Sequence, residues 1–79
     1  MVEEIEEKLI DKFPTLQIEV NYVKIKMYSI KIDTKTIFYE WKDNLTFSAN
    51  IEMIIYYINL IVGGNKKWLN KNFYKLFQN

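Results

Sequence analysis

Lysine is the only basic residue type in this 79-residue chain, because histidine and arginine are absent, and cysteine is absent as well. Serine and cysteine nucleophiles are usually activated by histidine, and most zinc sites are built from cysteine and histidine. The only two glycines, Gly63-Gly64, form no phosphate-binding loop. The glutamates between residues 3 and 7 have the pattern of a solvated helix face, not of paired catalytic carboxylates. The chain is therefore predicted not to be an enzyme and to bind no metal or cofactor.

Two groups of lysines are candidates for contacts with phosphate. One recurs every four residues on a predicted C-terminal helix and consists of Lys67, Lys71 and Lys75. The other belongs to a predicted sheet, where we expect lysines on the face away from the helices: Lys24, Lys26 and Lys31, with Lys35 at a turn. Clustered positive charge favours nucleic-acid binding, yet arginine for guanine recognition is missing and the net charge is only +1. Nucleic-acid binding is therefore the alternative hypothesis.

Aromatic residues favour a protein partner. The chain holds two tryptophans and six tyrosines, and these residue types dominate the energetics of protein interfaces. Tyr56 and Tyr57 are adjacent, so on a helix they point about 100° apart and are not both expected to face a sheet. We expect partial exposure of Trp41, Tyr56, Tyr57, Trp68 and Tyr74, with burial in the core as the competing interpretation. The candidate partner-binding residues are Tyr56, Tyr57 and Trp68, together with Lys67, Lys71 and Lys75.

The element that has to position most of these residues is a helix predicted over residues 49–62. It has almost no polar face, and Glu52 is its only charge. Ser48 is the expected N-cap, with Phe47 before it as a hydrophobic staple, and Gly63-Gly64 ends the helix. The apolar run is shorter than the roughly 20 residues that span a membrane, so no membrane span is predicted. Such a helix must be covered on several sides, by the rest of the chain or by a second copy in a homodimer.

The residues before this helix predict one further helix and a sheet. Apolar residues at helical spacing predict a helix over residues 2–12, which ends before Pro14. From Leu16 the apolar residues alternate, as in half-buried strands. The alternation changes phase near Asn21-Tyr22 and near Met27-Tyr28; we favour a turn at the first position and a bulge at the second, although the opposite assignment also fits.

A second hairpin turn is predicted at Asp33-Thr34-Lys35, followed by a strand over residues 36–42 with Ile37, Tyr39 and Trp41 on one face. After Gly63-Gly64, Asn65 can cap a last helix whose apolar stripe is Leu69, Phe73, Leu76 and Phe77. The predicted fold is a single α+β domain over residues 1–79. Its order is αβββαα, and the helices pack on one face of a three-stranded antiparallel meander.

Charge and composition bear on where the protein acts. The first twenty residues are mainly acidic, whereas the residues after Gly64 carry lysines and no acid. The acidic start lacks the features of a signal peptide, which predicts a cytoplasmic location. The exclusive use of lysine, with abundant isoleucine and asparagine, is typical of an AT-rich coding sequence and indicates an AT-rich bacterium, a phage or another mobile element.

The predicted order of elements, in a chain of this size, resembles small phage-encoded anti-CRISPR proteins that inhibit Cas9. The ending is similar too, with an apolar helix, a glycine break, Trp68 and a helix containing Phe73-Tyr74. Those inhibitors are acidic and mimic DNA, whereas this chain is acidic only in its first helix, so no residue role is carried over. The resemblance implies a small cytoplasmic module that binds a host protein stoichiometrically, with a defence nuclease as the implied partner.

Overall fold

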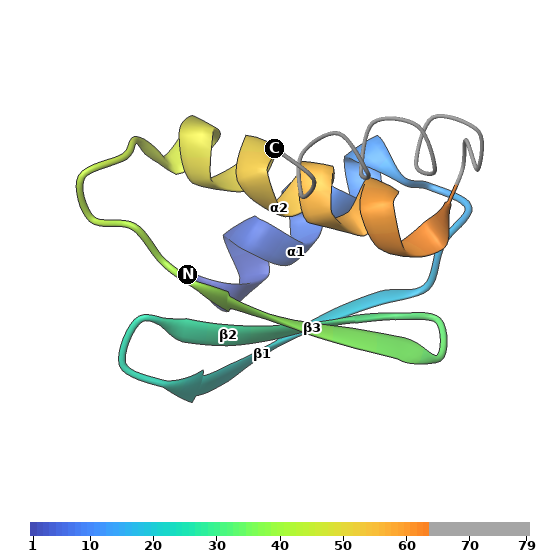
Figure 1. Cartoon of the computed structure of the whole chain (residues 1–79), viewed down its shortest axis with the longest axis horizontal. Coiled ribbons are helices and arrows are strands. Elements are labelled where there is room, and N and C mark those ends of the chain that lie inside the picture. The colour runs from blue at the N-terminus through green and yellow to red at the C-terminus, as the bar shows by residue number, and fades with distance from the viewer. Residues whose placement is uncertain (64–79) are drawn as a thin grey trace, which may run out of the picture.

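The computed structural model describes residues 1–63, which form two helices and three strands (Figure 1). In chain order these are α1 (Val2–Lys12), β1 (Ile18–Lys24), β2 (Met27–Ile32), β3 (Lys35–Glu40) and α2 (Phe47–Val62). The α+β class, the meander and the later helix are therefore confirmed. The predicted last helix lies outside the described residues, and so do Trp68 and the lysines that follow Gly64.

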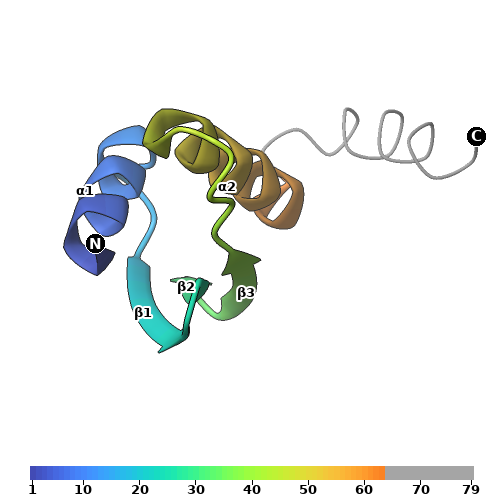
Figure 2. The ribbon, with the colours of Figure 1, turned by 90° about the vertical axis from the view of Figure 1, so that its left-hand side faces the viewer.

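The sheet is antiparallel in the order β1-β2-β3, and both helices lie on the same face of it (Figure 2). The core lies between the two layers, because alternate strand residues and one stripe of each helix meet there. Most of its side chains are isoleucine. Its fully buried side chains include Ile5, Leu9, Ile30, Ile54 and Ile58. The opposite face of the sheet has no covering element among residues 1–63.

The first hairpin differs from the favoured prediction. Asn21 and Tyr22 are strand residues paired with Ser29 and Tyr28, and the register shift lies between Tyr22 and Lys24. The turn is at Ile25-Lys26, where Lys26 has a left-handed φ of 64°. The favoured turn at Asn21-Tyr22 is therefore wrong, as is the bulge at Met27-Tyr28. The opposite assignment is nearer to the structure.

The start of α2 is also corrected. The N-cap is Thr46, whose hydroxyl accepts a hydrogen bond from the Ala49 amide at 3.1 Å. Ser48 is therefore not the cap, and Phe47 is the first helical residue, not a staple before it. The predicted glycine end is confirmed, because Gly63 takes a left-handed φ of 60° and its amide donates to Asn59. None of the helices within residues 1–63 has the length and apolarity needed to cross a membrane.

Candidate functional site

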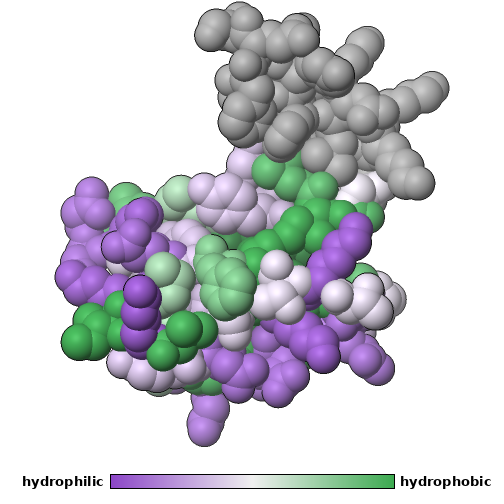
Figure 3. All heavy atoms as spheres, turned by 60° about the horizontal axis from the view of Figure 1, so that its bottom comes forward, coloured by the Kyte–Doolittle hydropathy of each residue, from purple (hydrophilic) through white to green (hydrophobic). Residues whose placement is uncertain are grey.

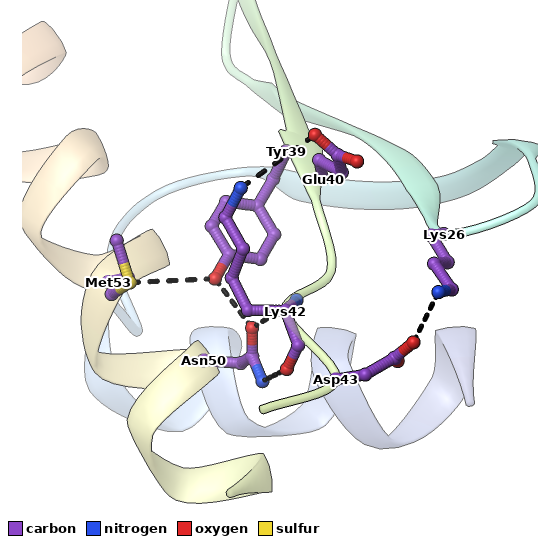
Figure 4. Close-up of polar contacts among 7 residues, drawn as sticks. All are labelled: Lys26, Tyr39, Glu40, Lys42, Asp43, Asn50 and Met53. Carbon is purple, nitrogen blue, oxygen red and sulfur yellow. Dashed lines mark hydrogen bonds and ion pairs between the residues drawn. The ribbon is translucent and has the colours of Figure 1, made fainter. Parts of the chain in front are cut away.

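Asn50 organises the junction between β3 and α2, where the candidate site begins. Its side chain is fully buried, and its Oδ1 accepts hydrogen bonds from the Tyr39 hydroxyl at 2.6 Å and the Lys42 amide at 3.0 Å. Its Nδ2 donates to the carbonyls of Lys42 and Thr46, each at 3.0 Å. Figure 4 shows this side chain reaching from α2 toward Tyr39 and Lys42. The amide therefore fixes the end of β3 against the first turn of α2.

Aromatic side chains extend from this junction along the same side of the sheet. The rings of Tyr28 and Tyr39 each meet Trp41 edge to face, with centroids 6.0 and 6.3 Å apart. Trp41 in turn contacts Phe47. Burial raises the pKa of the Tyr39 hydroxyl, with a further contribution from the nearby Tyr57. Many of the numerous aromatics are thus explained by packing at the margin of the isoleucine core.

The predicted partner residues Tyr56 and Tyr57 lie side by side on α2, with ring centroids 5.6 Å apart. Each is 38% exposed, which agrees with the expected partial exposure. They are not equivalent, because Tyr57 also packs against Tyr39, at 6.4 Å between ring centroids. The other partner candidates, Trp68, Lys67, Lys71 and Lys75, lie outside the described residues, as does Tyr74.

A groove separates β3 from the C-terminal half of α2. It has a volume of about 570 Å³, and its walls are mostly apolar, with Ile37, Tyr57, Leu60 and Ile61 among the lining residues. Glu40 and Lys42 supply its charges at the end where β3 leads toward α2. At the other end, the Lys35 ammonium donates to the Ile61 carbonyl at 3.3 Å. The groove therefore ends close to the point where the described chain ends.

The two edges of the sheet are protected unequally. On β1, the Val20 amide donates to Glu6 of α1 at 2.9 Å, and the register shift between Tyr22 and Lys24 interrupts the strand nearby. On β3, the Trp41 amide points toward β2, where it donates to the Lys26 carbonyl. Antiparallel alternation then directs the amides of Thr36, Phe38 and Glu40 away from the sheet. No strand within residues 1–63 pairs with that edge, and an edge of this kind is a site for further pairing.

The sheet face turned away from the helices is here called the open face, and it carries both acidic and basic side chains. By cross-strand register its residues are Glu19, Asn21, Lys24, Met27, Ser29, Lys31, Thr36, Phe38 and Glu40. Each lysine on it shares a cross-strand row with an acid, because Lys31 lies between Glu19 and Thr36 and Lys24 is in the row of Glu40. Figure 3 shows hydrophobic and hydrophilic residues interspersed over this side of the molecule. The open face is therefore mixed and not basic.

The structure does not bring the four sheet lysines together. Lys24 and Lys31 do lie on the open face. The prediction is wrong for Lys26, which lies in the hairpin turn and forms an ion pair with Asp43 that raises the pKa of the lysine. It is also corrected for Lys35, which is the first residue of β3 and faces the helix layer, opposite the buried Ile32.

The most exposed aromatic residue among residues 1–63 was missed by the sequence interpretation. Phe38 is 67% exposed at the middle of β3, on the open face and beside the groove. At the far end of the first hairpin Tyr22, Val23 and Ile25 are also exposed, Ile25 to 79%. The alternation in β3 held the signal for Phe38, because a strand that turns Ile37 and Tyr39 inward turns Phe38 outward.

Residues 1–63 contain no group of three or more acidic, histidine or cysteine side chains that could hold a metal ion. Comparison of the chain with protein-family models, with curated proteins and with solved structures gave no match.

Proposed function

We propose that the protein is a non-enzymatic binding module that contacts a partner protein through the open face and the edge of β3. The observation that carries this proposal is the exposure of Phe38, a large aromatic side chain in the middle of an unpaired strand. An exposed aromatic flanked by polar residues is typical of an interface centre with a polar rim. The outward amides of β3 add main-chain donors to the same surface.

The partner class follows from the composition and from the resemblance to anti-CRISPR proteins. We propose a module of phage or mobile-element origin that acts in the host cytoplasm and binds a host protein stoichiometrically. A defence nuclease such as a CRISPR nuclease is the proposed partner. The mixed charge of the open face supports recognition of a protein surface over mimicry of DNA, which would need a continuous acidic surface.

We also propose that the complete chain has the order αβββαα, with a last helix added to the five elements described above. A last helix after Gly63 would pack on the same side of the sheet as α1 and α2, because that side holds the exposed apolar side chains of α2. The open face would then stay free for a partner. A homodimer that uses Tyr56 and Tyr57 is the alternative for the same apolar side chains, and sedimentation of the free protein at high concentration separates the two.

Affinity capture tests the proposal. The tagged full chain is incubated with lysate of a candidate host, with and without prior digestion of nucleic acids, and the captured protein is quantified against the bait. We expect one partner molecule per chain, unaffected by the digestion and lost from the Phe38→Asp variant. Ile10→Asp, at an exposed apolar position on α1, is the matched control and should retain the partner.

Capture of nucleic acid alone, with a steep loss as salt rises, would establish the alternative hypothesis of nucleic-acid binding instead. Equal capture by the Phe38→Asp variant would remove the proposed surface. A free protein that sediments as a homodimer would support the alternative in which Tyr56 and Tyr57 form a dimer interface.

A further inference from the structure

The two hairpins of the meander differ in the residues at their turns. The turn between β2 and β3 is Asp33-Thr34, and aspartate tolerates the left-handed φ of 55° that Asp33 adopts there. The turn between β1 and β2 is Ile25-Lys26, in which the isoleucine is 79% exposed and the lysine is left-handed. Turn positions with a positive φ favour glycine or asparagine. Turn geometry therefore does not explain the residues of the first hairpin.

Apolar side chains gather around the first turn, in residues 22–27, which we call the hairpin tip. Tyr22 and Val23 are 58% and 46% exposed beside Ile25, and Met27 is half-buried. Figure 1 shows the hairpin tip at the opposite end of the sheet from the second hairpin and from the end of α2. The tip is a projecting end of the sheet, and no element within residues 1–63 covers it.

The charged residues of the hairpin tip are all basic. Lys24 and Lys26 flank Ile25, and the segment contains no acid. Two acids lie beside the tip, and each is paired with a lysine: Asp43 with Lys26, and Glu40 with Lys42. The charge of Lys24 is therefore in excess at this end of the sheet.

This combination of side chains fits the boundary of a lipid bilayer. Isoleucine and valine can enter the edge of the acyl region, a tyrosine ring favours the headgroup level, and lysine stems extend to the lipid phosphates. A fluid lipid surface adapts to a projecting tip without a preformed pocket. Nucleic acid is the rival, but its binding depends on several cations at the phosphates, and the tip supplies only two lysines.

We propose that the hairpin tip binds the surface of membranes that contain anionic lipids. Ile25 and Val23 enter the headgroup boundary, and Lys24 binds the phosphates. The contact involves one leaflet and is not a membrane span. Lipids of negative charge are abundant on the cytoplasmic side of membranes, where they attract exposed lysines.

The proposal does not rest on the partner protein proposed above. Ser29, the cross-strand neighbour of Phe38, lies three residues beyond Lys26, which is roughly 10 Å from the turn along the strand. A tip that enters only the headgroup boundary therefore leaves Phe38 available. The membrane contact and the open face can be tested separately.

Vesicle flotation of the full chain tests the proposal. The probe is phosphatidylcholine vesicles with about 30% phosphatidylglycerol, compared with pure phosphatidylcholine. The tip has less apolar surface than one myristoyl chain, so we expect weak, reversible binding, half-complete at roughly 1 mM lipid. Ile25→Asp should lower the partition coefficient by at least about tenfold. Ile10→Asp, at an exposed apolar position of α1, is the matched control and should bind as the wild type does.

The lysine contribution has its own pair of variants. Lys24→Gln should weaken binding to the anionic vesicles by several-fold and leave the weaker binding to pure phosphatidylcholine unchanged. Lys31→Gln, at an exposed position farther along the sheet, should have no effect. Absence of binding to anionic vesicles, or equal losses in Ile25→Asp and Ile10→Asp, would overturn the proposal.

A second measurement locates the contact without removing a native interaction of the core. The chain has no native cysteine, so Ile25→Cys and Thr34→Cys each carry one environment-sensitive dye, at the first and the second hairpin. We expect vesicles to shift the emission to the blue for the dye at residue 25 only. An equal shift at residue 34 would contradict the proposal. A response at residue 25 to duplex DNA or to raised protein concentration, with none to vesicles, would assign the tip to nucleic acid or to a second copy instead.

Discussion

At the scale of single residues, Asn50 is the buried polar side chain on which the β3–α2 junction depends. It bonds three backbone carbonyls, one backbone amide and one hydroxyl, all within the short connection between the strand and the helix or next to it. A buried amide of this kind is stabilising only while all of its partners are present, since each unpaired group would pay its full desolvation cost. Asn50 therefore specifies where α2 starts as well as stabilising it.

Replacement of Asn50 by leucine should be strongly destabilising. The change preserves size but leaves the Lys42 and Thr46 groups without their partner, at an expected cost of roughly 3 kcal/mol in the free energy of unfolding. Asn59→Leu, at an exposed position of the same helix, should change it by less than about 0.5 kcal/mol. Urea denaturation of both variants is the measurement. A cost for Asn50→Leu no greater than that of the control would show that the junction does not depend on this network.

Tyr39 should make stability fall at alkaline pH. Its pKa is raised above the ordinary value of 10.0 because burial disfavours the phenolate. The protonated form is thus favoured by the folded state, so its contribution is complete below the ordinary pKa and is lost as pH rises through the folded-state pKa. Denaturation between pH 8 and 11 should show a smaller alkaline loss in Tyr39→Phe than in the wild type. A parallel pH dependence in both proteins would refute this assignment.

At the scale of elements, the start of α2 separates local from tertiary determinants. Thr46 and Ser48 are both favourable capping residues by type, and serine is ranked above threonine. The structure selects Thr46 because the Asn50 side chain and backbone amide both bond the Thr46 carbonyl, and because Phe47 then packs on Trp41. Sequence alone could not choose, since the deciding contacts come from the end of β3.

Capping variants test this assignment directly. Thr46→Ala should lower the free energy of unfolding by about 1 kcal/mol, because the Ala49 amide loses its acceptor. Ser48→Ala should be close to neutral or slightly stabilising, since alanine has the higher helix propensity. Thermal or urea denaturation of the two variants distinguishes the caps, and the reverse order of effects would restore Ser48.

Other elements show the same limit of prediction. The bounds of α1, the turn at Asp33 and the end of α2 at Gly63 were predictable, because each is decided by a few neighbouring residues. The turn at Ile25-Lys26 was not, because a left-handed lysine is unfavourable locally and is held by contacts with Trp41 and Asp43, which are distant in sequence. The groove could not be predicted either, since it arises from the separation of two elements.

At the scale of the whole molecule, the structure divides the apolar surface into two parts with different explanations. Burial of one side of α2 in the core accounts for much of the apolar character that the sequence shows over residues 49–62, and the groove beside β3 accounts for Tyr57, Leu60 and Ile61. The open face and the first hairpin retain Phe38 and Ile25, for which residues 1–63 offer no cover. The four sheet lysines do not form one face, and Lys67, Lys71 and Lys75 lie outside the described residues, so a protein partner stays the proposal and nucleic acid the alternative.

The central claim is that Phe38 contributes to partner binding and not to folding. The most direct measurement is the affinity of the captured partner for the wild type and for the Phe38→Ala and Ile10→Ala variants, with the free energy of unfolding of each measured in parallel. We predict that Phe38→Ala weakens binding by at least about tenfold and changes stability by less than about 0.5 kcal/mol, while Ile10→Ala retains wild-type affinity. An unchanged affinity in Phe38→Ala would contradict the account.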